Sequence, residues 1–308
     1  MTIQQLEYLL AVDRYRHFAK AAEQCGVKQP TLSAMIQKLE EELGAKLFDR
    51  NVQPVRPTPV GRKIIKQARV VIAQASLVRD IVYEEKRTLT GIFRLGVLPT
   101  IAPYLLPRFF PRLMEEHPEL DIRVSEMKTH QIHQALRSGE LDAAIVASRL
   151  DDEALAEEPL FYEQFFGYVA RGESLFGHDL IRTSDITGER LWLLDEGHCF
   201  REQLTRFCQL ESVKLSQMAY RLGSMETFMR MVESGKGITF IPELATLQLC
   251  EEQRLLVRPF AIPRPTRQVG LAYGRDFVRR SLLDVLKLSI QAAVPREMLA
   301  PRVEQSLV

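Results

Sequence analysis

The sequence predicts an α+β multidomain chain with a small helical head, a long helix and a larger body of alternating strands and helices. Three observations lead to this fold class. Apolar residues recur at helical spacing in three short segments before residue 45, and small apolar residues repeat at 4-3 spacing from Ile64 to Val82. Beyond Gly91, strand-like and helix-like segments alternate. We place the domains at 1–58, 59–88 and 89–308.

Composition and charge narrow the class of protein. Hydrophobic residues make up 46% of the chain and charged residues 26%, as in ordinary soluble proteins. Residues 1–90 hold 15 Lys and Arg against 10 Asp and Glu, whereas residues 91–308 hold 26 against 30. A basic head on a slightly acidic body favours a polyanion partner. Without an export signal or an apolar run near about 18 residues, we expect a cytoplasmic protein with no membrane partner, and not an exported solute-binding protein.

The head begins with two short helices and a third that follows a tight turn. Gly26 breaks the second helix, Pro30 suits the first turn of the third, and Gly44 suits its end. Two short helices joined by a glycine-containing turn are typical of a helix-turn-helix. The apolar faces of the first two helices comprise Leu6, Leu9, Leu10, Val12, Phe18, Ala21, Ala22 and Cys25.

The third helix carries short polar and amide side chains opposite its apolar stripe, as base reading in a major groove requires. A solvated helix face would look the same, but the basic segment that follows favours nucleic acid. There, 47–50 and 55–58 predict two extended pieces around a loop, a wing that could place arginines on phosphates or in a minor groove. The predicted DNA-contacting residues are Gln29, Pro30, Thr31, Ser33, Gln37, Lys38, Arg50 and Arg56.

The segment from Ala19 to Leu43, with Leu47-Phe48-Asp49-Arg50 and Thr58-Pro59-Val60-Gly61, resembles the winged helix-turn-helix of the LysR-type transcriptional regulators. The resemblance covers residues 1–65. It implies binding of double-stranded DNA, with Gln29 to Lys38 as the reading helix.

A long helix is expected after the wing, because Thr58 is a good N-terminal cap and Pro59 a good first helical residue. A heptad-like seam over nearly three repeats is typical of paired helices, although a helix packed on its own domain shows a similar period. In LysR-type proteins this helix pairs with a partner subunit. The resemblance therefore implies a two-fold dimer, often built into a tetramer, on a pseudo-palindromic site. The seam consists of Ile64, Ala68, Val71, Ala75, Val78 and Val82.

The alternating body predicts parallel α/β sheets with right-handed crossovers. In LysR-type proteins this region resembles a periplasmic binding protein, which implies a two-lobed regulatory domain, here 91–163 with 268–308 and, separately, 164–267. Because ligands lie beyond the carboxyl ends of strands in such sheets, Thr100, Thr129 and Cys199 should face one cleft. Strands are expected at 92–97, 120–125, 141–147, 166–170, 191–194, 237–241 and 268–274, and helices at 104–116, 130–138, 201–207, 226–233 and 277–292.

Cys199 and Cys208 flank a segment of helical composition, 201–207. If this segment is helical, a rise of about 1.5 Å per residue puts their Cα atoms about 13 Å apart, whereas a disulfide needs about 7 Å or less. The two thiols could therefore bond only if the segment refolds, which would make the pair a switch. Disulfides in cytosolic proteins are more often transient or redox-sensing than structural.

Cys199 precedes the expected helix, where the helix dipole and the charges of His198 and Arg201 favour a thiolate. A buried inert thiol is the plain alternative for any lone cysteine, and we assign it to Cys25 and Cys250. A metal site is disfavoured, because the two cysteines and one histidine lack closely spaced ligand pairs.

The run from Gly197 to Gln203, with Cys208 nine residues after Cys199, resembles the sensor loop of the hydrogen-peroxide-responsive LysR-type regulators. The segments 96–100, 103–107 and 129–131 share the resemblance. It implies that Cys199 is the peroxidatic cysteine and Cys208 the resolving one. It further implies that peroxide is bound or polarised by Thr100, Thr129, His130, His198 and Arg267, with Arg264 as a nearby alternative for the arginine.

Together these features predict a transcriptional regulator, not an enzyme, that senses hydrogen peroxide through a reversible Cys199–Cys208 disulfide and controls oxidative-stress genes. Its expected partners are double-stranded DNA, hydrogen peroxide, further copies of itself and RNA polymerase, and no metal or cofactor is expected. Oxidation should unwind 201–207 and change the burial of Phe200, Leu204 and Phe207. Two alternatives stay open, namely a LysR-type regulator switched by a small co-inducer in the same cleft, and a thiol peroxidase.

Overall fold

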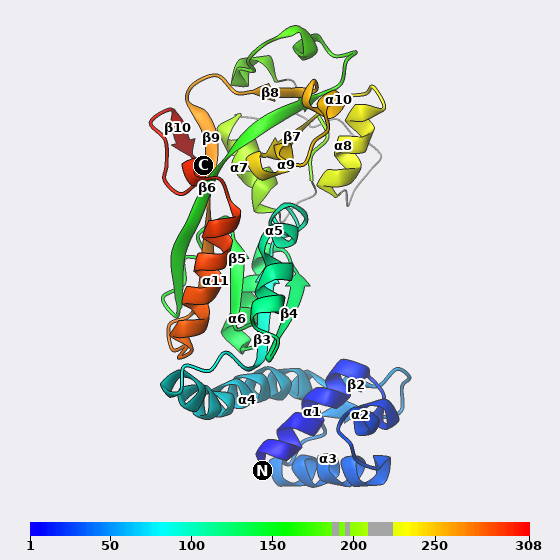
Figure 1. Cartoon of the computed structure of the whole chain (residues 1–308). Helices are drawn as coiled ribbons and strands as arrows, with labels where there is room; N and C mark the ends of the chain where they lie inside the picture. Colours follow the sequence, from blue (N-terminus) through cyan, green and yellow to red (C-terminus); the bar gives the residue numbers. More distant parts are fainter. Residues whose placement is uncertain (187–190, 195–197, 209–223) are drawn as a thin grey trace. The chain divides into compact units, whose positions relative to one another are not determined.

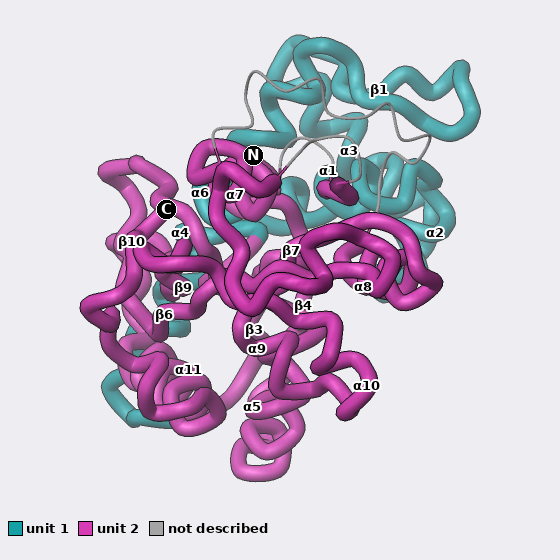
Figure 2. Tube along the Cα trace, turned by 90° about the horizontal axis from the view of Figure 1, so that it is seen from above, with its two compact units in different colours: residues 1–88, 135–140 teal, residues 89–134, 141–308 magenta. Residues whose placement is uncertain are grey.

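The computed structural model describes residues 1–186, 191–194, 198–208 and 224–308. It forms two compact units, which Figure 2 colours separately. The first unit is Met1–Thr88 with Ala135–Glu140, and the second is Leu89–Gln134 with Leu141–Val308. Within the described ranges, no helix is both long and apolar enough to cross a membrane.

The first unit confirms the predicted helix-turn-helix, wing and long helix. Gly44 ends the third helix with a φ of 64°, a left-handed conformation that glycine adopts without strain. Thr58 caps the long helix by accepting a 2.9 Å hydrogen bond from the Gly61 N–H, and Pro59 is its first residue. The elements are α1 (Ile3–Tyr15), α2 (Phe18–Gln24), α3 (Gln29–Leu43), β1 (Phe48–Asp49), β2 (Arg56–Pro57) and α4 (Pro59–Glu85).

A buried carboxylate joins α3 to the wing. Glu40 is only 2% exposed, and its Oε1 accepts the Leu47 N–H at 2.7 Å. Its other oxygen accepts from Arg50 at 3.2 Å. Since β1 begins at Phe48, this one side chain fixes where the wing leaves the helix.

The second unit is built on a mixed sheet. β3 pairs in parallel with β4 and β5, and β5 then pairs antiparallel with β9. β6 runs antiparallel to β9, and its far end pairs antiparallel with β7 and β8, so β6 and β9 pass between the two ends of the sheet (Figure 1). The strands are β3 (Gly91–Val97), β4 (Leu120–Glu126), β5 (Ala143–Val146), β6 (Leu155–Val169), β7 (Ile238–Pro242), β8 (Val257–Pro259), β9 (Arg264–Gly274) and β10 (Gln305–Leu307).

Helices cover this sheet at positions close to those predicted. The two long crossing strands produce the expected two-lobed arrangement, with α5 and α11 in contact with one another (Figure 1). The helices are α5 (Ala102–Glu116), α6 (Thr129–Ser138), α7 (Cys199–Phe207), α8 (Met225–Glu233), α9 (Glu243–Thr246), α10 (Glu251–Arg254) and α11 (Arg280–Ala293).

Three sequence-based expectations were wrong. The sheet is not parallel throughout, because β6 and β9 are antiparallel partners. The strand expected at 166–170 is longer than predicted and begins at Leu155. The prediction missed its first half because that half alternates between buried and exposed residues and has no apolar run. Residues 191–194 form no strand, and Leu191 makes only an isolated bridge to Ile238.

Glu40→Ala should lower the free energy of unfolding of the first unit by about 1–3 kcal/mol, because it leaves the buried Leu47 N–H without a partner. Thermal or urea unfolding of the full chain measures this loss. Glu42, on the same helix and exposed, supplies the control, and Glu42→Ala should change stability much less. Equal losses for the two variants would contradict the assigned role of Glu40.

Candidate functional site

Helix α7 places the two cysteines of interest at its two ends. It begins at Cys199 itself, two residues earlier than expected, with His198 as the capping residue. The Cys208 N–H donates to the Leu204 carbonyl at 2.9 Å and closes the last turn. Both thiols are free. The helical state of 201–207 is thus confirmed, and nine residues of helix put the two Cα atoms about 13 Å apart.

Cys199 faces a cleft of about 850 Å³, although only 5% of the residue is exposed. Thr129 and His130 enter the same cleft from the start of α6, and Ser148 enters from the chain just after β5. Thr129 and Cys199 therefore face one cleft as expected, although Cys199 does not follow a strand.

Among the described residues, several buried polar atoms around this cleft lack hydrogen-bond partners of standard geometry. Four buried side-chain polar atoms have no hydrogen-bond partner within the described ranges, and three of them belong to residues that line the cleft. These three atoms are Thr129 Oγ1, Ser148 Oγ and Gln203 Oε1. Buried polar atoms are normally satisfied, so these three atoms are free to form hydrogen bonds with a small polar molecule in the cleft.

Behind the thiol lies the fully buried guanidinium of Arg267, which is 0% exposed. It forms an ion pair with Glu163 at 2.6 Å and donates to the Thr100 hydroxyl at 3.0 Å. Phe200, the second residue of α7, lies with its ring centroid 5.2 Å from the guanidinium carbon. Thr100 thus reaches the site through Arg267 and does not line the cleft itself.

Opposing effects set the acidity of Cys199. Burial raises the pKa of its thiol, while the charge of Arg267 and the hydroxyls of Thr129 and Ser148 lower the pKa. Both hydroxyls act on the sulfur from close by, although neither forms a hydrogen bond of standard geometry with a described residue. The net result is a raised pKa, contrary to the thiolate expected from the helix start. The Arg201 guanidinium donates to the Leu194 carbonyl at 2.9 Å.

Cys208 has a different environment. It is 5% exposed, and burial alone raises the pKa of its thiol to about 12. The adjacent Phe207 packs edge-to-face on Phe260, with ring centroids 6.0 Å apart. Since burial is the only effect that the described residues exert on its pKa, the Cys208 thiol is a poor nucleophile while α7 is folded.

Of the remaining predicted residues, some lie at the site and others lie away from it. His198 caps α7, with its carbonyl accepting the Arg201 N–H, and Gly197 lies outside the described residues. Arg264 pairs with Glu304 at 3.3 Å, so Arg267 is the arginine beside the thiol. Cys250 is exposed, which makes the expectation of a buried cysteine wrong there, and Cys25 is half-buried.

Sequence reasoning missed three residues of the site. Gln203 donates its amide to the carbonyls of Ala147 at 2.7 Å and Val308 at 3.3 Å. Glu163 sits in the middle of β6, where a charge with no visible partner gives no signal in the sequence. Ser148 could have been found, because it directly follows a buried strand on the side where Thr100 and Thr129 were expected.

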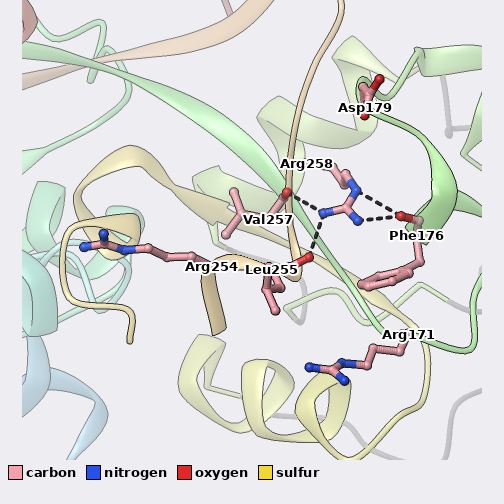
Figure 3. Close-up of a pocket in the computed structure, with 7 residues that line it drawn as sticks. All are labelled: Arg171, Phe176, Asp179, Arg254, Leu255, Val257 and Arg258. Carbon is pink, nitrogen blue, oxygen red and sulfur yellow. Dashed lines mark hydrogen bonds between the residues drawn. The ribbon is translucent and has the colours of Figure 1, made fainter. Parts of the chain in front are cut away.

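A second hollow in the same unit has no thiol. Its central residue, Arg258, donates to the main-chain oxygens of Phe176, Leu255 and Val257 (Figure 3). Its guanidinium also lies 4.7 Å from the Phe176 ring centroid. This arginine serves the local fold, and we do not assign the hollow to the site.

In the first unit, the predicted reading face of α3 points outward. Gln29, Pro30, Thr31, Gln37 and Lys38 are exposed, and Ser33 is half-buried. Arg56 on β2 is also exposed. Arg50 is less available than expected, because it donates to Ser33 at 3.1 Å and Glu40 and lies over the Phe18 ring.

Comparisons with known proteins match both units. Residues 3–62 match the bacterial regulatory helix-turn-helix protein of the lysR family, and residues 86–294 match the LysR substrate binding domain. The chain is 36% identical, over 95% of both chains, to the DNA-binding transcriptional dual regulator OxyR of Escherichia coli K12.

Solved structures agree with these matches. Full-length OxyR C199D from Pseudomonas aeruginosa has a TM-score of 0.78 and 35% identity, and the match covers 96% of this chain and 99% of that one. OxyR from Porphyromonas gingivalis has a TM-score of 0.67 and 53% identity, and the match covers 71% of this chain and 99% of that one.

The raised thiol pKa values predict a distinctive pH dependence of alkylation. A raised pKa keeps the thiol protonated to higher pH, so labelling of Cys199 should keep rising where a free cysteine peptide has levelled off. Cys208, whose thiol pKa is raised to about 12, should show the same late rise. Peptide-resolved mass spectrometry after brief iodoacetamide pulses measures both, with the urea-unfolded chain as control. Labelling of Cys199 that levels off at lower pH than the free peptide would contradict the assignment.

Proposed function

Because this chain belongs to the LysR family of bacterial regulators, we propose that it is a DNA-binding transcriptional regulator that senses hydrogen peroxide through Cys199 and Cys208. One observation carries the proposal. A single helix, α7, holds two free thiols apart, one beside an arginine and unpartnered hydroxyls, the other in an apolar setting. A similar protein from Dickeya chrysanthemi, 36% identical over 95% of this chain and 100% of its own, is named hydrogen peroxide-inducible genes activator.

Oxidation proceeds in two balanced steps. The Cys199 thiolate attacks one peroxide oxygen, so an S–O bond forms, the O–O bond breaks, and the departing hydroxide takes up a proton to become water. The Cys208 thiolate then attacks the sulfenic sulfur, so an S–S bond forms, the S–O bond breaks, and the departing hydroxide takes up a proton to become water. In this scheme Thr129, His130 and Arg267 bind or polarise the peroxide, and Thr100 and His198 support them.

The second step requires α7 to unwind, because the thiols at its ends are too far apart to bond. Unwinding removes Phe200 from Phe165, whose ring centroid lies 5.0 Å away. It also exposes Leu204, which is 0% exposed in the helix, and separates Phe207 from Phe260. The disulfide therefore replaces a packed helix with a different surface.

That new surface would act on DNA through subunit contacts. Pairing of α4 with a second copy would present two reading helices to a pseudo-palindromic site, and a change in subunit packing would alter their spacing. Val78 and Val82 of the seam, and Ile81 beside them, are exposed on α4. Ile64, Ala68 and Val71 instead pack on the core of the first unit, so the second half of the seam is the part that would pair. A dimer built into a tetramer, with contact to RNA polymerase, is the assembly we propose, in the cytoplasm.

Two other functions fit less well. A cleft of about 850 Å³ is larger than a peroxide molecule, which favours a small co-inducer as the second candidate. A thiol peroxidase would explain the cysteines but not the winged helix, and we propose that the chain is not an enzyme.

Cys199→Ser should abolish the change in the DNA footprint that peroxide produces with the unaltered chain. The test is DNase I footprinting of the reduced protein before and after stoichiometric peroxide, with mass spectrometry of the 199–208 disulfide. Cys250→Ser, which removes an exposed thiol elsewhere, is the matched control and should respond normally. A full response by Cys199→Ser would favour the co-inducer.

Leu204→Ala should make the disulfide harder to reduce, since it weakens only the packed, reduced helix. Loss of about 2–5 kcal/mol of packing corresponds to a potential about 40–110 mV more negative, at about 30 mV per 1.4 kcal/mol. Redox titration against dithiothreitol measures the shift. Thr205→Ala removes only a hydrogen bond within the helix and should change little. An unshifted potential for Leu204→Ala would mean that α7 survives oxidation.

A further inference from the structure

We propose that Ser148 is a further peroxide-binding residue of the sensor, whose hydroxyl holds the oxygen that Cys199 attacks. The inference rests on the proposed function and adds a contact to it. Ser148 follows β5 by two residues and lines the cleft together with Cys199 and Thr129. These three residues come from α6, α7 and the chain after β5, and the fold brings them together around one cleft.

The Ser148 hydroxyl is available for a guest. Its oxygen is buried and, within the described ranges, forms no hydrogen bond of standard geometry; the Cys199 sulfur is the polar atom on which it acts. It lies close enough to the sulfur to lower the pKa of Cys199, as Thr129 does. A buried hydroxyl without a partner is costly, so a small molecule that pairs with both hydroxyls would bind well here.

Hydrogen peroxide matches these groups. Each of its oxygens can donate one hydrogen bond and accept others, as a hydroxyl can. Gln203 supplies an acceptor, because its amide nitrogen is held by the carbonyls of Ala147 and Val308 and its Oε1 is therefore the unpaired atom. Two hydroxyls beside the sulfur and one carbonyl oxygen can thus orient both ends of the molecule.

The contact would act on the first oxidation step. As the S–O bond forms and the O–O bond breaks, two electrons pass from sulfur to peroxide, and negative charge develops on the departing oxygen, which leaves as hydroxide and is protonated. The attacked oxygen stays on the sulfur as the sulfenic acid, within reach of Ser148 and Thr129. A hydroxyl that holds this oxygen in line therefore speeds oxidation without being consumed.

The test compares two rates in the full-length chain carrying Cys208→Ser, which stops the reaction at the sulfenic acid. Oxidation of Cys199 by peroxide is followed by dimedone trapping, and its alkylation by iodoacetamide is followed in parallel. Ser148→Ala should slow oxidation about ten- to hundredfold and alkylation by a clearly smaller factor. Ser234→Ala, which removes a hydroxyl outside the cleft, should alter neither rate.

Oxidation of Ser148→Ala at the unaltered rate would overturn the inference. An equal fall in both rates would also overturn it, because Ser148 would then act only on the thiolate. If Ser148→Ala fails to fold, Ser148→Gly removes the same hydroxyl and is judged by the same two rates. Failure of the parent chain to oxidise at Cys199 would instead reject the proposed function itself, which separates the two claims.

Discussion

The buried guanidinium of Arg267 is the interaction on which the sensor depends. Its ion pair with Glu163 joins β9 to β6, its hydrogen bonds to Thr100 hold the chain after β3, and its face supports Phe200 of α7. Loss of either charged partner would leave the other buried and unpaired, at a cost of about 3–5 kcal/mol. The same group lowers the pKa of Cys199 against the effect of burial. One residue therefore links the fold, the packing of α7 and the reactivity of the thiol.

The packing of α7 has two consequences that work in opposite directions. It keeps Cys199 and Cys208 about 13 Å apart, so a disulfide cannot form while the helix persists. It also stabilises the reduced state, which raises the reduction potential and keeps the disulfide reversible. Cys208 has a raised pKa only while it is buried, so unwinding would both bring it nearer and make it more reactive.

Sequence patterns predicted the local elements well, because caps and periodicities are properties of neighbouring residues. Gly44, Thr58 and the helix at 201–207 are examples. Pairings between distant residues were not predictable in this way. Nothing near Glu163 signals that Arg267 lies beside it, 104 residues along the chain, and the antiparallel course of β6 depends on β9 in the same manner. The chemistry of Cys199 was misjudged for a related reason, since burial by distant residues outweighs the local effect of a helix start.

Hydrogen exchange across α7 tests the central claim most directly. Its amides, such as the Cys208 N–H bonded to Leu204 and the Arg201 N–H bonded to His198, can be followed in reduced chain and in chain carrying the Cys199–Cys208 disulfide. The account predicts protected amides in the reduced protein and rapid exchange from 199 to 208 in the oxidised protein, with α11 unchanged in both. Equal protection of α7 in the two states, with the disulfide verified by mass spectrometry, would contradict it.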